Sequence, residues 1–510
     1  MEKPLGFFHL SKKMQTKESL KGLDKRLVSR RDLFLDRLVS RRSCVLHQLS
    51  RSWKEEMGLW RFLGNPRFGW ESLRTDILCP IGEKVAGRHV LSIQDGSTIS
   101  LKGYLTGRKG FGQTGTQGDH PGFEMHPALV LDAQDGGCIG LAALELHEGN
   151  ALAAPVKQDQ RRKGAEAGTK KTGVWLRVGS ATRRLLNEAA QVTHIADREA
   201  DFFEMMLEFG QKKVSNEAFI VRSNADRLLG HRLGRGQAPN GGQPDLLFET
   251  GLGGPPLRLP YKSPMSGLLG QLPARATCRL KLPATHKRKK RTALVEIRFA
   301  QQVPLCRSRQ LYGRTYEGER LPGSVRVAIV EVREVTPDLS PGQELIYWRL
   351  FTSHPVHSVE GALQIVKWYT FRWKIELFFA AAKSQGLDLE HARIEHAPRL
   401  KKLAVLVAMA TVQVIQLLQA RDGNSEQPIS DVFSAEEAEL IVKINPKLEG
   451  KTDLLKNPHK PNSLAFATWV IARLGGWKGY KTHRPPGIKT ISRGLLAFFQ
   501  LKNAIPLLSG

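Results

Sequence analysis

The sequence contains 510 residues, and its 77 Lys and Arg against 49 Asp and Glu give a formal net charge of +28 at pH 7. This length exceeds the size at which one hydrophobic core usually stops growing, so we expect two or three structural units. The charge favours a polyanionic partner, chiefly nucleic acid, although ribosomal, membrane-surface and heparin-binding proteins share this composition. The five cysteines include no C-x-x-C pair, which argues against a disulfide framework or thiolate zinc site and fits a reducing cytoplasm.

Residues 1–80 are basic and predicted to be helical. They contain no sustained apolar region ending in small residues, so we expect no secretory signal. The motif RLVSRR occurs at Arg26–Arg31 and again at Arg37–Arg42. At about 100° per residue, this repeat places four arginines in one stripe of a helix: Arg26, Arg30, Arg37 and Arg41. The stripe is a candidate phosphate-binding surface, and the alternative is the solvated face of an amphipathic helix.

Residues 81–224 are predicted to form a mixed α/β layer. The region begins with three strands, of which the last two form a hairpin around Asp135. A helix near Val174–Ala190 comes next, followed by a strand, a second helix and the strand AFIVRSN. Asp95 and Asp197 each end an apolar strand-like run, SIQD and HIAD, where a carboxylate can face a site. An Asp at a strand end is also a common turn or cap residue, so neither position is informative alone.

Residues 225–344 have the composition of a β-rich region, with many Gly and Pro and alternating apolar segments. The segments RATCRLKL and TALVEIRF are the clearest, and we expect them to form a hairpin. Its tip would carry the cationic run His286–Arg291, which is either a DNA contact or an ordinary solvated loop.

Helical patterns return in the last part of the chain. Helices are predicted from Ser358 to about Gln385, over Ala397–Arg421 and over Ser463–Leu474. Leu403–Leu418 is the most apolar stretch, but it contains Thr and Gln and is shorter than a bilayer span. We therefore predict a buried helix there and no membrane partner.

The segment WYTFRWKIELFFAAAKSQG is the most informative part of the sequence. On one continuous helix, four of its polar side chains lie within roughly 60° of one another: Tyr369, Arg372, Glu376 and Lys383. An apolar stripe lies beside them and would pack on the α/β layer: Phe371, Ile375, Phe378 and Ala382. Such a helix can hold a carboxylate toward a site while its cationic and phenolic groups reach phosphate oxygens. The spacing of Arg372 and Glu376 would equally produce a surface salt bridge.

The pattern Y-x2-R-x3-E-x6-K, with DREAD at Asp197–Asp201, resembles the insertion-sequence-four family of bacterial DDE transposases. Three further segments carry the resemblance: WRFLGNP at Trp60–Pro66, WRLFTSHPV at Trp348–Val356 and IARLGGW at Ile471–Trp477. The resemblance implies an α/β fold with an RNase H-like catalytic core in two parts, residues 81–224 and 345–400. A β-rich insert over residues 225–344 would interrupt this core, between a helical DNA-binding N-terminal region (1–80) and a helical C-terminal region (401–510).

The resemblance also implies roles for individual residues. Asp95, Asp197 and Glu376 match the catalytic triad, which would bind two Mg²⁺ ions, with Mn²⁺ as a substitute; paired ions of this kind lie roughly 3.5–4 Å apart. Four residues match positions that contact DNA, the last an aromatic residue on which a flipped base stacks: Tyr369, Arg372, Lys383 and Trp348. Arg222 is a further candidate DNA contact, and the alternative for Trp348 is a core aromatic residue on a strand.

The function implied is cleavage of double-stranded DNA at the ends of a transposable element and transfer of the 3′ hydroxyl ends into target DNA. The resemblance further implies a homodimer in the DNA complex and a bacterial, DNA-associated cytoplasmic protein. Two alternatives stay open. One is a catalytically inactive DNA-binding descendant, against which the complete triad argues, and the other is an RNase H-like nuclease without strand transfer. The first 55 or so residues align with no part of the family, so the recognised end sequence is unassigned.

Overall fold

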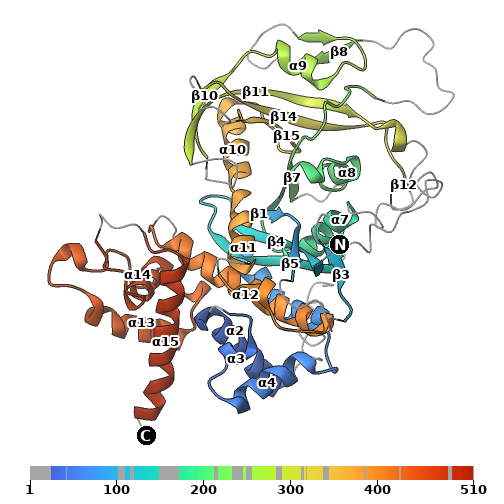
Figure 1. The fold of residues 1–510 in the computed structure, drawn as a ribbon. Coiled ribbons are helices and arrows are strands. Elements are labelled where there is room, and N and C mark those ends of the chain that lie inside the picture. Colours follow the sequence, from blue (N-terminus) through green and yellow to red (C-terminus); the bar gives the residue numbers. More distant parts are fainter. Residues whose placement is uncertain are drawn as a thin grey trace, which may run out of the picture.

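The protein has a mixed α/β fold built around one large sheet, with helices at both ends of the chain lying side by side (Figure 1). The computed structural model describes residues 24–41, 43–101, 109–114, 120–148, 172–211, 216–231, 245–248, 256–282, 290–311, 315–316, 319–336, 344–383, 386–423, 427–480 and 485–508.

The helices that precede the sheet are α2 (Lys25–Arg41), α3 (Leu46–Leu49), α4 (Trp53–Gly64), α5 (Trp70–Leu78) and α6 (Ile81–Val85). Helix α2 buries Phe34 and Leu38, as its apolar spacing predicts. One continuous helix carries the predicted arginine stripe, but Arg37 is not open to a phosphate, because it is only 6% exposed and its Nε donates to Glu55 Oε1 of α4 at 2.7 Å. Arg37 therefore joins two helices, and Arg42 lies outside the described residues.

Five strands form the middle of the sheet: β1 (His89–Gln94), β4 (His120–Asp132), β5 (Cys138–Glu148), β6 (Gln191–Ala196) and β7 (Glu217–Arg222). Strands β5, β4 and β1 form an antiparallel meander, which confirms the predicted hairpin between β4 and β5. On the other side of β1, β6 runs parallel to β1, and β7 runs parallel to β6. The apolar sequences of β1 and β6 suit this position, since five of the six residues in each strand are buried.

Shorter elements surround these five strands. The strands β2 (Ser97–Ser100) and β3 (Gly112–Thr114) pair with β4. The helix α7 (Gly173–Leu185) packs on β4 and β5. It ends at Leu185, whereas the sequence predicted a helix that continues to Ala190. The 3₁₀ turn η2 (Arg198–Ala200) and the helix α8 (Phe203–Gly210) connect β6 to β7.

The sheet continues beyond β7 through strands from later in the chain. These are β10 (Ala276–Leu282), β11 (Arg291–Cys306), β14 (Ser324–Glu334) and β15 (Tyr347–Thr352), and they complete the order β10-β11-β14-β15-β7-β6-β1-β4-β2. The antiparallel pairing of β10 with β11 confirms the second predicted hairpin, but its tip, residues 283–289, lies outside the described residues. Small elements accompany these strands: β8 (Leu246–Phe248), β9 (Leu257–Leu259), α9 (Met265–Gln271), η3 (Arg309–Leu311), β12 (Thr315–Tyr316) and β13 (Glu319–Arg320).

The predicted helix from Ser358 to Gln385 is wrong as a single helix. It consists of α10 (Val359–Thr370) and α11 (Trp373–Lys383), with a turn at Phe371 and Arg372 between them. Through this turn the backbone N–H groups of Phe371, Arg372, Lys374 and Ile375 each bond to the carbonyl three residues earlier, as in a 3₁₀ helix.

The C-terminal region is helical, as predicted. It contains η4 (Leu389–His391), α12 (Ala397–Ala420), η5 (Ile429–Asp431), α13 (Ala435–Leu448), η6 (Asp453–Leu455), α14 (Leu464–Leu474) and α15 (Ile488–Leu508). Helix α12 is long and apolar enough to cross a bilayer, but 83% of its most apolar window is buried inside the protein. It contacts α2, β5 and α11, so α12 occupies the position of a core helix, as the sequence predicts.

Candidate active site

Asp95 and Asp197 lie at the same edge of the sheet, directly after the neighbouring parallel strands β1 and β6. Ile93 pairs with Ile195, so each aspartate stands two residues beyond this pair. Asp95 Oδ1 accepts a hydrogen bond from the N–H of Gly96 at 2.9 Å, and Asp197 Oδ1 accepts one from the N–H of Glu199 at 2.8 Å. These local bonds fix both carboxylates at the strand ends.

The environment of Asp95 disfavours its negative charge. Burial, together with the negative charge of Asp197, raises the pKa of this carboxyl to about 7, although Arg372 acts in the opposite direction. The Asp95 carboxyl is therefore partly buried and lies near enough to Asp197 to feel its negative charge. A perturbed carboxyl beside a second one is a physical indicator of a functional site.

Arg372 connects the aspartates to Glu376. From the turn between α10 and α11, Arg372 Nη1 lies 3.4 Å from Asp95 Oδ2, and Arg372 Nη2 donates to Glu376 Oε1 at 2.8 Å. The charge of Asp197 is near enough to help raise the pKa of Arg372 against the effect of burial. Two of the predicted carboxylates thus contact the side chain of Arg372, a residue only 9% exposed, and the charge of the third acts on it.

The aromatic residues predicted to contact DNA lie beside this guanidinium. Tyr369 is 2% exposed; burial raises the pKa of its phenol, while the positive charges of Arg222 and Arg372 oppose the shift. The Trp348 ring on β15 packs edge-on against Tyr369, with ring centroids 5.2 Å apart, and against Trp373 at 5.8 Å. With an exposure of 5%, Trp348 occupies a core position in this conformation.

Lys383 lies at the far end of α11. Its Nζ donates to Ser97 Oγ at 2.8 Å and to the carbonyl of Thr98, both on β2, and it lies 3.9 Å from Glu390 Oε1. Because β2 begins two residues after Asp95, Lys383 ties the end of α11 to the segment that carries the first aspartate.

The resemblance implies that the three carboxylates are ligands for Mg²⁺. Within the described residues, no group of three or more His, Cys, Asp or Glu side chains is placed to hold a metal ion together. The chemistry of the donors nevertheless suits Mg²⁺, which prefers carboxylate oxygens. Asp95 Oδ2 and Glu376 Oε1, two of the oxygens that would bind the ion, are directed at Arg372 instead. In this arrangement Arg372 neutralises both oxygens.

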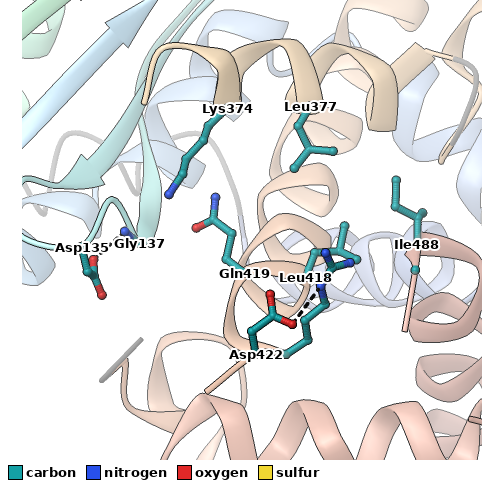
Figure 2. A pocket seen from close by; sticks show the side chains of 10 residues that line it. Asp135, Gly137, Lys374, Leu377, Leu418, Gln419, Asp422 and Ile488 are labelled. Carbon is teal, nitrogen blue, oxygen red and sulfur yellow. Dashed lines mark hydrogen bonds and ion pairs between the residues drawn. The ribbon is translucent and has the colours of Figure 1, made fainter. Parts of the chain in front are cut away.

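A separate cavity of about 500 Å³ lies on the opposite side of α11 (Figure 2). Lys374 and Leu377 project into it from α11, opposite Gln419 and Asp422 near the end of α12 (Figure 2). Lys374 is two residues from Glu376, which is about 200° around a helix. None of the predicted catalytic residues lines this cavity.

The sequence did not reveal the central position of Arg372. The signal was present in the i to i+4 spacing of Arg372 and Glu376, which predicts a salt bridge but not the burial of its cation. Because Asp95 approaches from another element, only the fold places it beside this pair. The anchoring of Lys383 on β2 has no local sequence signal either.

No protein-family model matches the chain.

Proposed function

We propose that this protein is a Mg²⁺-dependent DNA transposase, which cuts the ends of a transposable element and joins the exposed 3′ hydroxyls to target DNA. The observation that supports this proposal is that Arg372 contacts Asp95 and Glu376 and also feels the charge of Asp197. The three carboxylates come from two strand ends and one helix that are far apart in the sequence. The formal charge of +28 suits a DNA substrate.

The order of the strands supports an RNase H-like core as the scaffold. The meander β5-β4-β1 and the parallel strands β6 and β7 give a five-stranded unit in which the two aspartates follow the central pair. In this proposal β10, β11 and β14 belong to the β-rich insert, and the chain returns through β15 to the helix that carries Glu376.

Each carboxylate has a defined task in the proposed reaction. Asp95, Asp197 and Glu376 would hold Mg²⁺, which supplies charge stabilisation to the attacking and leaving oxygens of phosphoryl transfer. Burial on the sheet edge limits water around Asp95 and strengthens its electrostatic interactions.

The residues around the triad would hold the DNA. The side chain of Arg222 forms no hydrogen bond or ion pair with another described residue, so its guanidinium is available to a phosphate beside Tyr369. Lys383 adds a positive charge next to β2. Stacking of a flipped base on Trp348 requires Tyr369 or Trp373 to move, because both pack against its ring.

The test uses the purified protein and duplexes tiled across the DNA that flanks its coding sequence. We expect Mg²⁺-dependent nicking at inverted repeats, followed by joining of the labelled 3′ ends to a plasmid. The matched control is Glu376→Gln, which keeps the size of the side chain and removes its charge. Equal cleavage by Glu376→Gln and the wild type would refute the catalytic assignment.

The two alternative functions predict other products. A catalytically inactive descendant would bind the repeats without cutting them. An RNase H-like nuclease would cut DNA but join no 3′ end to the plasmid. Joined products together with nicking exclude both.

A further inference from the structure

Arg372 occupies the place that a cation would take among the candidate catalytic carboxylates. Its Nη2 is 2.8 Å from Glu376 Oε1, its Nη1 is 3.4 Å from Asp95 Oδ2, and the charge of Asp197 acts on it as well. A guanidinium and a divalent ion would compete for this position, because Arg372 already engages one oxygen of Asp95 and one of Glu376.

We infer that Arg372 is an internal counter-ion that closes the site in the DNA-free protein, and that a DNA phosphate must draw it out before the carboxylates bind metal. This inference rests on the proposed function and adds regulation to it. DNA binding and metal binding would then strengthen each other, since linkage between two sites is reciprocal.

The hydrogen bonding of Arg372 suits a contact that can be exchanged. A guanidinium has five N–H donors, yet the buried Nε of Arg372 has no hydrogen-bond partner among the described residues. Its contact with Asp95 is long, whereas its bond to Glu376 has an ordinary length. A DNA phosphate accepts two parallel N–H bonds from an arginine, so it can compete well for this side chain.

The backbone at Arg372 also suits movement. Arg372 lies in the 3₁₀ turn between α10 and α11, and such a turn within a helical segment often marks a hinge. Lys374, two residues later, donates to the carbonyl of Gly136 and holds the start of α11 on the β4–β5 turn. Arg372 can therefore change its direction while α11, with Glu376, stays in place.

Charge balance explains why the contact forms without DNA. Burial and Asp197 both disfavour the negative charge of Asp95, and Arg372 is the cation that opposes this effect. If Arg372 left without a replacement, several negative charges would face one another in a partly buried site, at a high energetic cost. Its departure should therefore coincide with the arrival of another cation.

The test measures Mn²⁺ binding to the full-length, DNA-free protein by electron paramagnetic resonance of the free ion. Arg372→Gln removes the internal counter-ion, and we expect it to bind Mn²⁺ about tenfold more tightly than the wild type. The matched control is Arg198→Gln, which removes an exposed positive charge beside Asp197 that contacts no carboxylate among the described residues. Mn²⁺ binding by Arg372→Gln no tighter than that by the wild type or by Arg198→Gln would overturn the inference.

A second measurement requires only that the wild type and Glu376→Gln fold. We expect a duplex from the flanking DNA to tighten Mn²⁺ binding by the wild type. DNA itself binds Mn²⁺, so the Mn²⁺ bound by a mixture of the duplex and Glu376→Gln is subtracted. An unchanged affinity counts against the counter-ion. The Glu376→Gln variant also tests the metal site itself. If it binds Mn²⁺ as tightly as the wild type in the absence of DNA, the proposed function is wrong, whatever the role of Arg372. If Glu376→Gln binds Mn²⁺ more weakly than the wild type but Arg372→Gln binds it no more tightly, the counter-ion role of Arg372 is rejected and the proposed function stands.

Discussion

Glu376 accepts a hydrogen bond from Arg372 at 2.8 Å, one helical turn away, while 47% of the Glu376 side chain stays exposed. The cation of this pair is buried and its carboxylate is open to solvent. A surface salt bridge would leave both groups exposed and contribute little to stability. This asymmetry, with Asp95 on the other side of the guanidinium, distinguishes the pair from the salt bridges that helical spacing commonly produces.

The raised pKa of Asp95 predicts a pH-dependent stability. Its folded-state pKa is about 7 against an ordinary value of 3.8, so the folded protein binds this proton more tightly than the unfolded chain. The free energy of unfolding should therefore fall as the pH rises from about 4 to about 7. Asp95→Asn removes this loss, and we expect it to be more stable than the wild type at pH 8 by on the order of 2 kcal/mol. Urea denaturation in EDTA at pH 5 and pH 8 measures the effect; a difference that does not change with pH would contradict it.

Lys374 should stabilise the fold more than Lys367, although both bond to the same turn. Lys374 Nζ donates to the carbonyl of Gly136 and is mostly buried, whereas the exposed Lys367 donates to the carbonyl of Gln134 at 2.8 Å. Lys374→Met leaves a carbonyl without this donor, and we expect a loss of about 1–2 kcal/mol of unfolding free energy. Lys367→Met is the matched control and should change stability little, since water replaces its bond. Equal losses in thermal unfolding would contradict the assignment.

Trp348 provides a test of core packing against DNA contact. Because its ring is buried against Tyr369 and Trp373, we expect Trp348→Ala to cost about 3–5 kcal/mol of unfolding free energy. Trp348→Phe retains an aromatic ring and should lose less. Urea denaturation of both variants decides the point, and a Trp348→Ala protein as stable as the wild type would show that the ring is not part of the core.

Local sequence patterns predict much of the fold. Apolar runs bounded by turn residues correctly indicate β1, β6 and the two hairpins, because buried strands need such runs. The shortness of the apolar stretch Leu403–Leu418 and the Thr and Gln within it likewise predict the burial of α12. The pairing of the strands could not be predicted in this way. Strand β6 lies beside β1 because of contacts between distant segments, and nothing within either strand specifies this neighbour.

The break after α10 had no signal of its own. Phe371 and Arg372 are followed by good helix formers, and no Gly or Pro interrupts the segment. The cause is tertiary contact, since the ring of Phe371 packs closely on Gly136, where an added Cβ would lie 3.0 Å from the ring, and Lys374 bonds to the carbonyl of that glycine. The same holds for Arg37, whose burial depends on Glu55 in another helix.

The central claim is that three carboxylates from β1, β6 and α11 act as one catalytic group on DNA. The most direct measurement compares Mg²⁺-dependent nicking of the flanking inverted repeats by the wild type with that by Asp95→Asn, Asp197→Asn and Glu376→Gln, each checked for folding by circular dichroism. We expect each single variant to lose activity by on the order of 10⁴-fold, because members of a catalytic unit fail together. Nicking at the wild-type rate by any folded variant of the three would contradict the claim.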